Sequence, residues 1–123
     1  MLRKLLARFE ERFGPRHVEV AVVLHNLGAT VSNAGRHVEA EALYRRALTI
    51  QRAKLGASHP EVALSLHNLA AVLGAQGRQR EALSLHRKAH SIARRALGPK
   101  HPTTLACAAA AAEAQRSTKR GGA

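Results

Sequence analysis

The 123-residue chain has almost no aromatic side chains: it contains Phe9, Phe13, Tyr44 and no tryptophan. Proteins that bind single-stranded nucleic acid usually stack the bases on aromatic rings. The scarcity therefore argues against this class of function, although contacts with a phosphate backbone remain open.

Cysteine is nearly absent too, because Cys107 is the only one. A single thiol excludes an internal disulfide and provides no cysteine cluster for a metal ion. Cys107 lies in an alanine-rich run, where we expect a buried and unreactive thiol. This cysteine usage is typical of a reducing compartment, and we expect a cytoplasmic protein.

Long apolar runs are missing. No stretch approaches the about 18 consecutive apolar residues that a membrane-spanning helix needs, so the sequence predicts no membrane span. The opening residues, Met1 to Phe13, carry the early cations Arg3 and Lys4 but no continuous apolar core. They do not match a secretory signal, and the repeat described below explains them better.

Acidic residues are few. The chain has 8 of them, all glutamate, against 20 Lys and Arg, which gives a net charge of +12. Such an excess favours anionic partners: an acidic peptide, nucleic acid or a membrane surface. A solvated helical surface rich in arginine has the same charge balance, so that interpretation also remains open.

Recognisable catalytic or metal-binding patterns are absent. The sequence has no paired acids, no phosphate-binding glycine loop and no Ser/His/Asp arrangement, so we expect neither an enzyme nor a cofactor. His86 and His90 have the spacing of two metal ligands on one helix face, but no third ligand is in view. We therefore expect no metal site.

The clearest positive signal is an internal repeat of 42 residues. Residues 14–55 align with residues 56–97 with 20 identities, and the segment Leu-His-Asn-Leu occurs in both copies. Apolar residues within each copy follow the 3–4 spacing of helices, and glycines separate the helical stretches. We expect helices over residues 2–13, 19–33, 37–54, 61–75, 79–96 and 103–116. The histidines His17, His59 and His101 recur at the turns, which indicates a structural role.

The repeat also predicts the organisation of the chain. We expect one helical repeat domain over residues 1–116 and a disordered tail over residues 117–123. The expected parts of this domain are the second helix of a partial repeat (1–13), two full repeats (14–55 and 56–97) and a capping helix of a partial repeat (98–116).

The two copies resemble tetratricopeptide repeats. The residues that carry the resemblance are Leu27-Gly28, Ala40-x3-Tyr44 and Ala47 in one copy and Leu69-Ala70, Ala82-x3-His86 and Ala89 in the next. His86 departs from the aromatic residue expected at its position. A repeat of 42 residues, longer than the usual length of about 34, is similar to the kinesin-light-chain type.

The resemblance implies an all-α fold: a right-handed α-solenoid of antiparallel helix pairs, with about two full repeats and flanking half-repeats. It implies a scaffold that binds a protein or peptide in a concave groove lined by first helices, and the net charge favours an acidic ligand there. The groove residues would be Val22, His25, Asn26, Ala29, Asn33, Leu64, His67, Asn68, Ala71 and Ala75. We expect the two histidines to favour an acidic ligand below about pH 6.5.

Two alternatives remain open. Cations on the second helices predict a convex basic stripe that could contact nucleic acid, formed by Arg45, Arg46, Arg52, Arg87, Lys88, Arg94 and Arg95. Leu2, Leu5, Leu6 and Phe9 lack a preceding first helix, and self-association would cover them.

Overall fold

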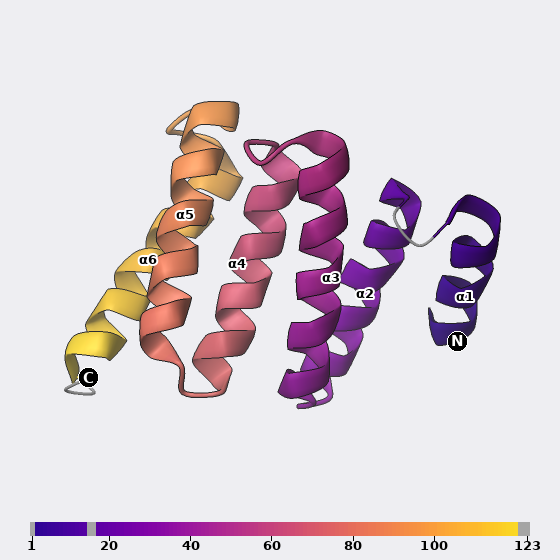
Figure 1. Ribbon diagram of the computed structural model, residues 1–123. Helices are drawn as coiled ribbons and strands as arrows, with labels where there is room; N and C mark the ends of the chain where they lie inside the picture. Colours follow the sequence, from indigo (N-terminus) through magenta and orange to yellow (C-terminus); the bar gives the residue numbers. More distant parts are fainter. Residues whose placement is uncertain (1, 15–16, 121–123) are drawn as a thin grey trace. The chain divides into compact units, whose positions relative to one another are not determined.

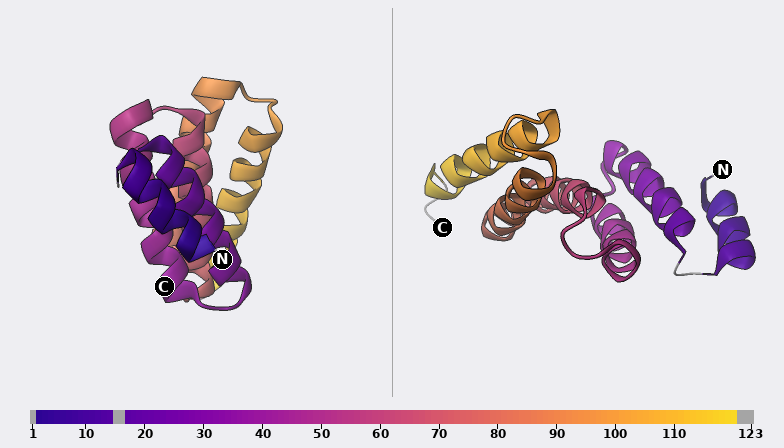
Figure 2. Two further views of the ribbon diagram at one scale, coloured as in Figure 1. Left: turned by 90° about the vertical axis from the view of Figure 1, so that its right-hand side faces the viewer. Right: turned by 90° about the horizontal axis from the view of Figure 1, so that it is seen from above.

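The computed structural model describes residues 2–14 and 17–120, and its described residues form helices and turns without strands. Figure 1 shows the helices in order along the chain, and Figure 2 shows them from two further sides. They are α1 (Leu2–Phe13), α2 (Val18–Asn33), α3 (His37–Leu55), α4 (Pro60–Ala75), α5 (Gln79–Leu97) and α6 (Pro102–Arg120). All the expected helices except the last begin and end within one residue of these bounds. The chain divides into two compact units, residues 1–57 and 58–123, and each is described by itself.

Histidine side chains cap the N-termini of α2, α4 and α6. The Nδ1 atom of His17 accepts a hydrogen bond of 3.0 Å from the backbone N–H of Glu19. His59 and His101 accept equivalent bonds of 3.1 Å two residues further on, at Glu61 and Thr103. These bonds satisfy amide groups that have no partner inside the helix. The recurring histidines therefore have the structural role that their spacing predicted.

Glycines with positive φ end the first helices. Gly35 has a φ of 84° and Gly77 a φ of 83°, a region that glycine adopts without a steric penalty. The turn lets the N–H of the next residue reach back to the helix, so that Arg36 donates to the carbonyl of Val31 at 2.9 Å. Each helix therefore stops at a defined residue, and the chain reverses into the second helix of the pair.

The first unit, α1 to α3, has a compact aliphatic core. Its central cluster consists of Val20, Ala21, Leu24, Ala47 and Ile50, with Leu6 and Leu43 packed against it. Leu6 therefore contributes to the core, whereas the neighbouring Leu5 is 39% exposed. The side chains of Leu2 and Phe9, the other members of the expected self-association patch, lie outside the described residues.

In the second unit, α5 packs against both α4 and α6. Leu66, Leu69 and Leu73 of α4 are almost completely buried. Cys107 of α6 is also buried, and this burial raises the pKa of its thiol. The cysteine is thus the buried and weakly reactive residue that the sequence predicted.

The last helix is longer than expected. The predicted helix ended at residue 116 and was followed by a disordered tail, but α6 continues to Arg120. Nothing in Ser117–Arg120 interrupts a helix, and the hydroxyl of Thr118 donates to the carbonyl of Ala114 at 2.9 Å. Cations in the last turn are also favourable for the helix dipole. The rest of the expected tail, residues 121–123, lies outside the described residues.

Gly28 allows α2 and α3 to approach closely. A Cβ atom at this position would lie 3.1 Å from the ring of Tyr44, which is buried. In the second unit the equivalent positions hold a slightly larger residue, Ala70, and a smaller ring, His86. In each repeat a small residue on the first helix is matched with a ring on the second helix. The smaller of the two small residues, Gly28, is matched with the larger ring, and Ala70 with the smaller one.

Gly28→Ala is expected to destabilise the protein by about 1 kcal/mol. Overpacking against Tyr44 costs about 1–3 kcal/mol, and the better helix propensity of alanine returns up to about 1 kcal/mol. Urea denaturation measures the change. In the double variant Gly28→Ala/Tyr44→His the ring is smaller, so a double-mutant cycle should give a favourable coupling energy. Additive effects would contradict the size compensation.

Candidate functional site

One side of α2 is exposed and carries no charge. Val22, Asn26, Ala29 and Asn33 are spaced by four, three and four residues, so they share one face of the helix. Val22 is 47% exposed, the two asparagines are exposed, and Ala29 is half-buried. These four residues are called the docking face of α2.

The equivalent face of α4 has the same character. Leu64, Asn68, Ala71 and Ala75 follow the same spacing, 42 residues further along the chain. Leu64 is 36% exposed, the two alanines are exposed, and Asn68 is half-buried. These residues are called the docking face of α4. Two matched, uncharged faces therefore occur in a chain with a net charge of +12.

The two predicted groove histidines contact the second helix of their own pair. The ring of His25 meets Tyr44 edge to face, with centroids 5.3 Å apart and an interplanar angle of 71°. His67 meets His86 in the same way, at 5.2 Å and 62°. These ring contacts were not predicted from the sequence, although the aromatic position of the resembled repeats, occupied here by Tyr44 and His86, is a signal that could have suggested them.

The His67–His86 pair contains two ring nitrogens that lack hydrogen-bond partners within the described part of the chain. The Nδ1 atoms of both rings are buried and have no hydrogen-bond partner among the described residues. Burial lowers the pKa of His67. Burial, with a smaller contribution from the charge of His67, lowers the pKa of His86 to about 4. His67 therefore becomes charged only at more acidic pH than expected, so the predicted preference for an acidic ligand just below pH 6.5 does not apply to it.

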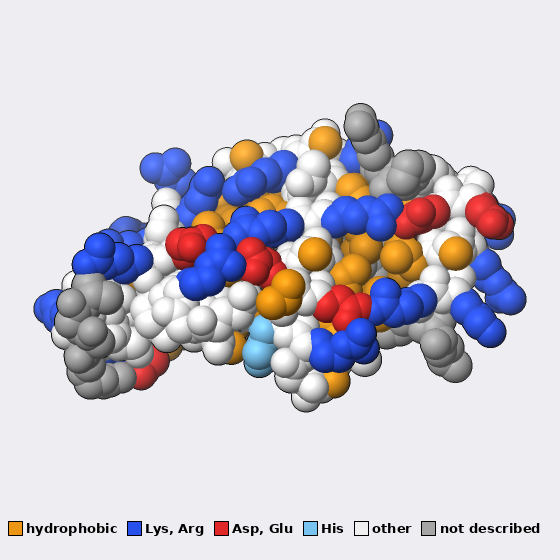
Figure 3. Space-filling view, turned by 60° about the horizontal axis from the view of Figure 1, so that its bottom comes forward, with side chains coloured by type: hydrophobic (Ala, Val, Ile, Leu, Met, Phe, Trp, Pro, Cys, Tyr) orange, Lys and Arg blue, Asp and Glu red, His pale blue; other side chains and the backbone are white. Residues whose placement is uncertain are grey.

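The predicted basic stripe differs between the two units. In the first unit, Arg45 pairs with Glu41 at 2.9 Å and Arg46 pairs with Glu10 at 2.6 Å, while Arg52 is exposed. The stripe residues of the second unit are exposed as well: Arg87, Lys88, Arg94 and Arg95. On the face drawn in Figure 3, acidic side chains lie beside some of the Lys and Arg side chains.

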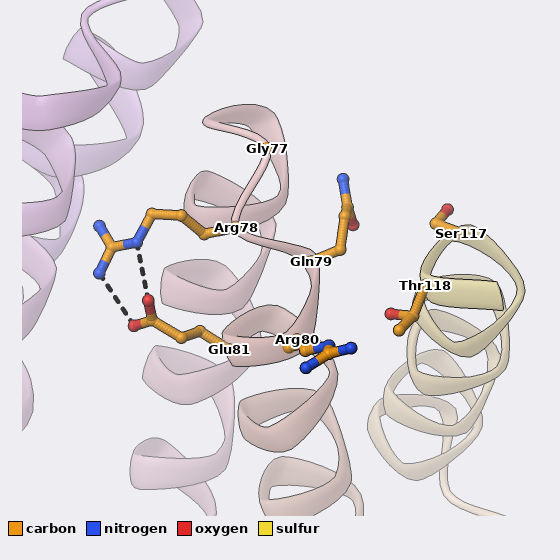
Figure 4. A pocket seen from close by; sticks show the side chains of 7 residues that line it. All are labelled: Gly77, Arg78, Gln79, Arg80, Glu81, Ser117 and Thr118. Atoms are coloured by element: carbon orange, nitrogen blue, oxygen red, sulfur yellow. Dashed lines mark hydrogen bonds and ion pairs between the residues drawn. The ribbon is translucent and has the colours of Figure 1, made fainter. Parts of the chain in front are cut away.

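A shallow pocket of about 370 Å³ lies between the start of α5 and the end of α6 (Figure 4). Its polar groups largely satisfy one another. Arg78 makes two hydrogen bonds of 2.9 Å to the carboxylate of Glu81, and the amide of Gln79 donates to the carbonyl of Gly74 at 3.0 Å. The pocket therefore offers few uncommitted groups to a ligand.

Residues 2–14 and 17–120 contain no group of three or more His, Cys, Asp or Glu side chains that could hold a metal ion. None of the described helices combines the length and the apolar character needed to cross a membrane.

Comparison with known proteins identifies the family. The family model for the tetratricopeptide repeat matches residues 1–53 and 32–93. No protein with a curated description matches the chain.

Two similar solved structures are crystal structures of a candidate kinesin light chain of Podosopora anserina with nearly identical TPR-like repeats. Their TM-scores are 0.79 and 0.77, and both are 28% identical to this chain. The similarity covers 97% of this chain but 56% of theirs, so the chain spans little more than half of their length. The all-α, solenoid class of fold predicted from the sequence is thereby confirmed. The chain belongs to the tetratricopeptide repeat family, and its repeats are of the kinesin-light-chain type.

Proposed function

We propose that this chain is a protein-interaction scaffold in which the docking face of α2 and the docking face of α4 each bind an extended peptide or protein segment. Tetratricopeptide repeats generally mediate contacts between proteins, and their helix pairs present extended binding surfaces. The observation that carries the proposal is the pair of matched, exposed and uncharged faces in a strongly cationic chain. Selection for solubility alone would favour charged residues at such exposed positions.

The chemistry of the docking faces suits a peptide backbone. The amide of Asn26 offers a donor and an acceptor, the two groups that an extended peptide also presents. Val22 and Leu64 provide exposed apolar contacts at equivalent positions. Ala29 and Ala71 are small, which leaves room for a backbone to approach. In this proposal His25 and His67 hold the faces in place from the side, through their ring contacts with α3 and α5.

The proposed role needs no catalytic residue and no cofactor. We also propose that the functional repeats are residues 14–55 and 56–97, with residues 1–13 and 98–116 as partial repeats at either side. Each full repeat then contains one docking face, and the scaffold acts in the cytoplasm.

A charge placed on both docking faces should weaken binding strongly. Val22→Glu/Leu64→Glu places one carboxylate on each docking face, where a bound peptide would bury it without a partner at a cost of several kcal/mol. Peptides are first selected from a random display library on the unmodified protein, and the dissociation constant of the tightest one is measured by fluorescence anisotropy. We expect the double variant to weaken binding at least tenfold.

The matched control is Ala42→Glu/Ser84→Glu. These residues are exposed and occupy equivalent positions on α3 and α5, so the change of net charge is the same. Binding to the control should stay within threefold of the unmodified protein, and circular dichroism should show equal melting temperatures for all three proteins. Equal losses in both variants, or failure to select any peptide, would reject the docking faces.

A further inference from the structure

The second unit has an unusually uneven distribution of charge. Residues 58–123 contain ten Lys and Arg but only three acids, Glu61, Glu81 and Glu113. Glu81 pairs with Arg78 and Glu113 pairs with Arg116. Between Glu81 and Glu113 the sequence has no acidic residue at all. Five cations lie in this interval: Arg87, Lys88, Arg94, Arg95 and Lys100.

In the first unit, the cations at two equivalent positions are neutralised by ion pairs. Arg45 and Arg46 are equivalent to Arg87 and Lys88, and carboxylates of Glu41 and Glu10 pair with them. In the second unit Leu83 replaces Glu41. Arg87 donates instead to the neutral side-chain oxygen of Gln115 at 2.9 Å, so its charge is not compensated. At these two positions the charge is therefore balanced in the first unit and unbalanced in the second.

Two of these cations, Arg94 and Arg95, border a shallow depression at the end of α5. Its volume is about 450 Å³, and His90, Ser91, Arg94, Arg95 and Pro99 line it. His90 and Arg94 are four residues apart, as are Ser91 and Arg95, so two adjacent rows of the helix converge on the depression. Within the described part of the second unit, no acidic side chain pairs with Arg94 or Arg95. These five lining residues are called the basic patch of α5.

We infer that the basic patch of α5 binds an acidic segment of a protein partner, with Arg94 and Arg95 holding its carboxylates. Arginine binds carboxylates through two parallel hydrogen bonds, and such charge-assisted bonds are about twice as strong as neutral ones. The patch shares no residue with the docking faces of α2 and α4. The inference therefore adds a second binding surface to the scaffold, and it stands or falls independently of the first.

The geometry of α5 favours a peptide as the partner. Arg87 and Arg94, like Lys88 and Arg95, are seven residues apart, which corresponds to about 10 Å along the helix axis. An extended peptide covers this distance in about three residues, so one acidic residue could contact Arg94 or Arg95 of the patch while another contacts Arg87 or Lys88 beyond it. The scarcity of aromatic residues removes the stacking platforms that single-stranded nucleic acid would use.

A charge-reversal pair tests the inference. The probe is a fluorescein-labelled peptide of ten glutamates, and its binding is measured by anisotropy at pH 7.5 in 100 mM NaCl. Arg94→Glu/Arg95→Glu is expected to weaken binding at least tenfold. The control is Arg52→Glu/Lys54→Glu, which makes the same change of net charge at the equivalent end of α3, where both residues are exposed. The control should lose less than threefold.

The possible outcomes separate clearly. A selective loss in the α5 variant supports the basic patch. Equal losses in the two variants would show that the peptide responds to net charge alone, and absence of binding by the unmodified protein would also overturn the inference. Tighter binding of a random DNA duplex than of the peptide would assign the surface to nucleic acid instead. All four substituted positions are exposed, and circular dichroism confirms that each variant is folded.

Discussion

Between pH 7.5 and about 4, the free energy of unfolding is expected to fall by about 3 kcal/mol because of His86 alone. This ring is only 7% exposed, and its pKa in the folded protein is lowered to about 4 from an ordinary value of 6.5. One pKa unit corresponds to about 1.4 kcal/mol, which gives the size of the effect. The loss is a large fraction of the stability of a typical domain, about 5–15 kcal/mol.

The direction of this pH dependence follows from proton binding. Between about pH 6.5 and 4 the unfolded chain carries a proton on His86 and the folded protein does not. The unfolded state therefore binds more protons, and stability falls as the pH falls. The contribution of the neutral ring is complete above about pH 6.5 and is lost as the pH approaches 4. Burial also lowers the pKa of His67, so its effect has the same sign.

His86→Leu should remove most of this dependence. Leucine has a similar volume, cannot take up a proton and leaves no unpartnered Nδ1 atom, so the variant is also expected to gain about 1 kcal/mol at pH 7.5. The second variant, Ala70→Gly/His86→Tyr, copies the arrangement of the first unit. Urea denaturation at pH 7.5, 6 and 4.5, followed by circular dichroism, gives the free energies. A pH dependence equal to that of the unmodified protein in both variants would refute the assignment to His86.

Tyr44 provides a local control for the same experiment. It is the only tyrosine, the chain has no tryptophan, and it lies in the first unit. Its fluorescence therefore reports on the first unit alone, whereas circular dichroism reports on all helices. At acidic pH we expect the helical signal to decrease at lower urea concentration than the tyrosine signal changes. Coincident transitions would show that the two units unfold together.

Leu24→Ala is expected to destabilise the protein by about 3 kcal/mol, within the range of about 2–5 kcal/mol for buried leucines. Leu24 is 0% exposed and lies in the central cluster of the first unit, in contact with a core that includes Ala47 and Ile50. Its removal leaves a cavity that these small and branched neighbours cannot fill. A decrease in the urea midpoint with an unchanged slope would show the loss directly.

Leu5→Ala is the control for this cavity. The chemical change is the same, but Leu5 is 39% exposed and lies on α1 of the same unit. We expect the substitution to lower the free energy of unfolding by less than about 1 kcal/mol. Because the Leu5 side chain stays partly in water in the folded protein, its removal sacrifices less buried apolar surface than the removal of Leu24. If the two substitutions lower the free energy of unfolding equally, the central cluster does not hold the first unit together in the way described.

Local signals made most of the helices predictable. Gly35 and Gly77 mark the ends of α2 and α4, because a positive φ is cheap only for glycine. The repeat of 42 residues then gave each helix a second, independent occurrence. The end of α6 was not predictable in the same way. Ser117 and Thr118 looked like the start of a tail, but they are compatible with a helix that begins in a strongly helix-favouring alanine run.

Contacts between helices were beyond the sequence. Glu10 and Arg46 are 36 residues apart, and their ion pair depends on how α1 and α3 lie within the first unit. The same packing brings Arg3 to Glu39. The Glu10–Arg46 pair balances one cation of the predicted stripe, which the sequence pattern alone did not show. The edge-to-face contact of His25 with Tyr44 likewise depends on helix rotation, which the repeat alone does not specify.

The capping histidines have a consequence for how such a chain can change over generations. Each pair of helices contains its own initiating ring and its own terminating glycine, and both signals act over at most five residues. A duplicated stretch of coding DNA that starts and ends in phase with the 42-residue interval would therefore supply a complete, self-delimited pair. Lengthening or shortening the array in this way needs no new junction chemistry, and surface residues such as those of the basic patch can then diverge copy by copy.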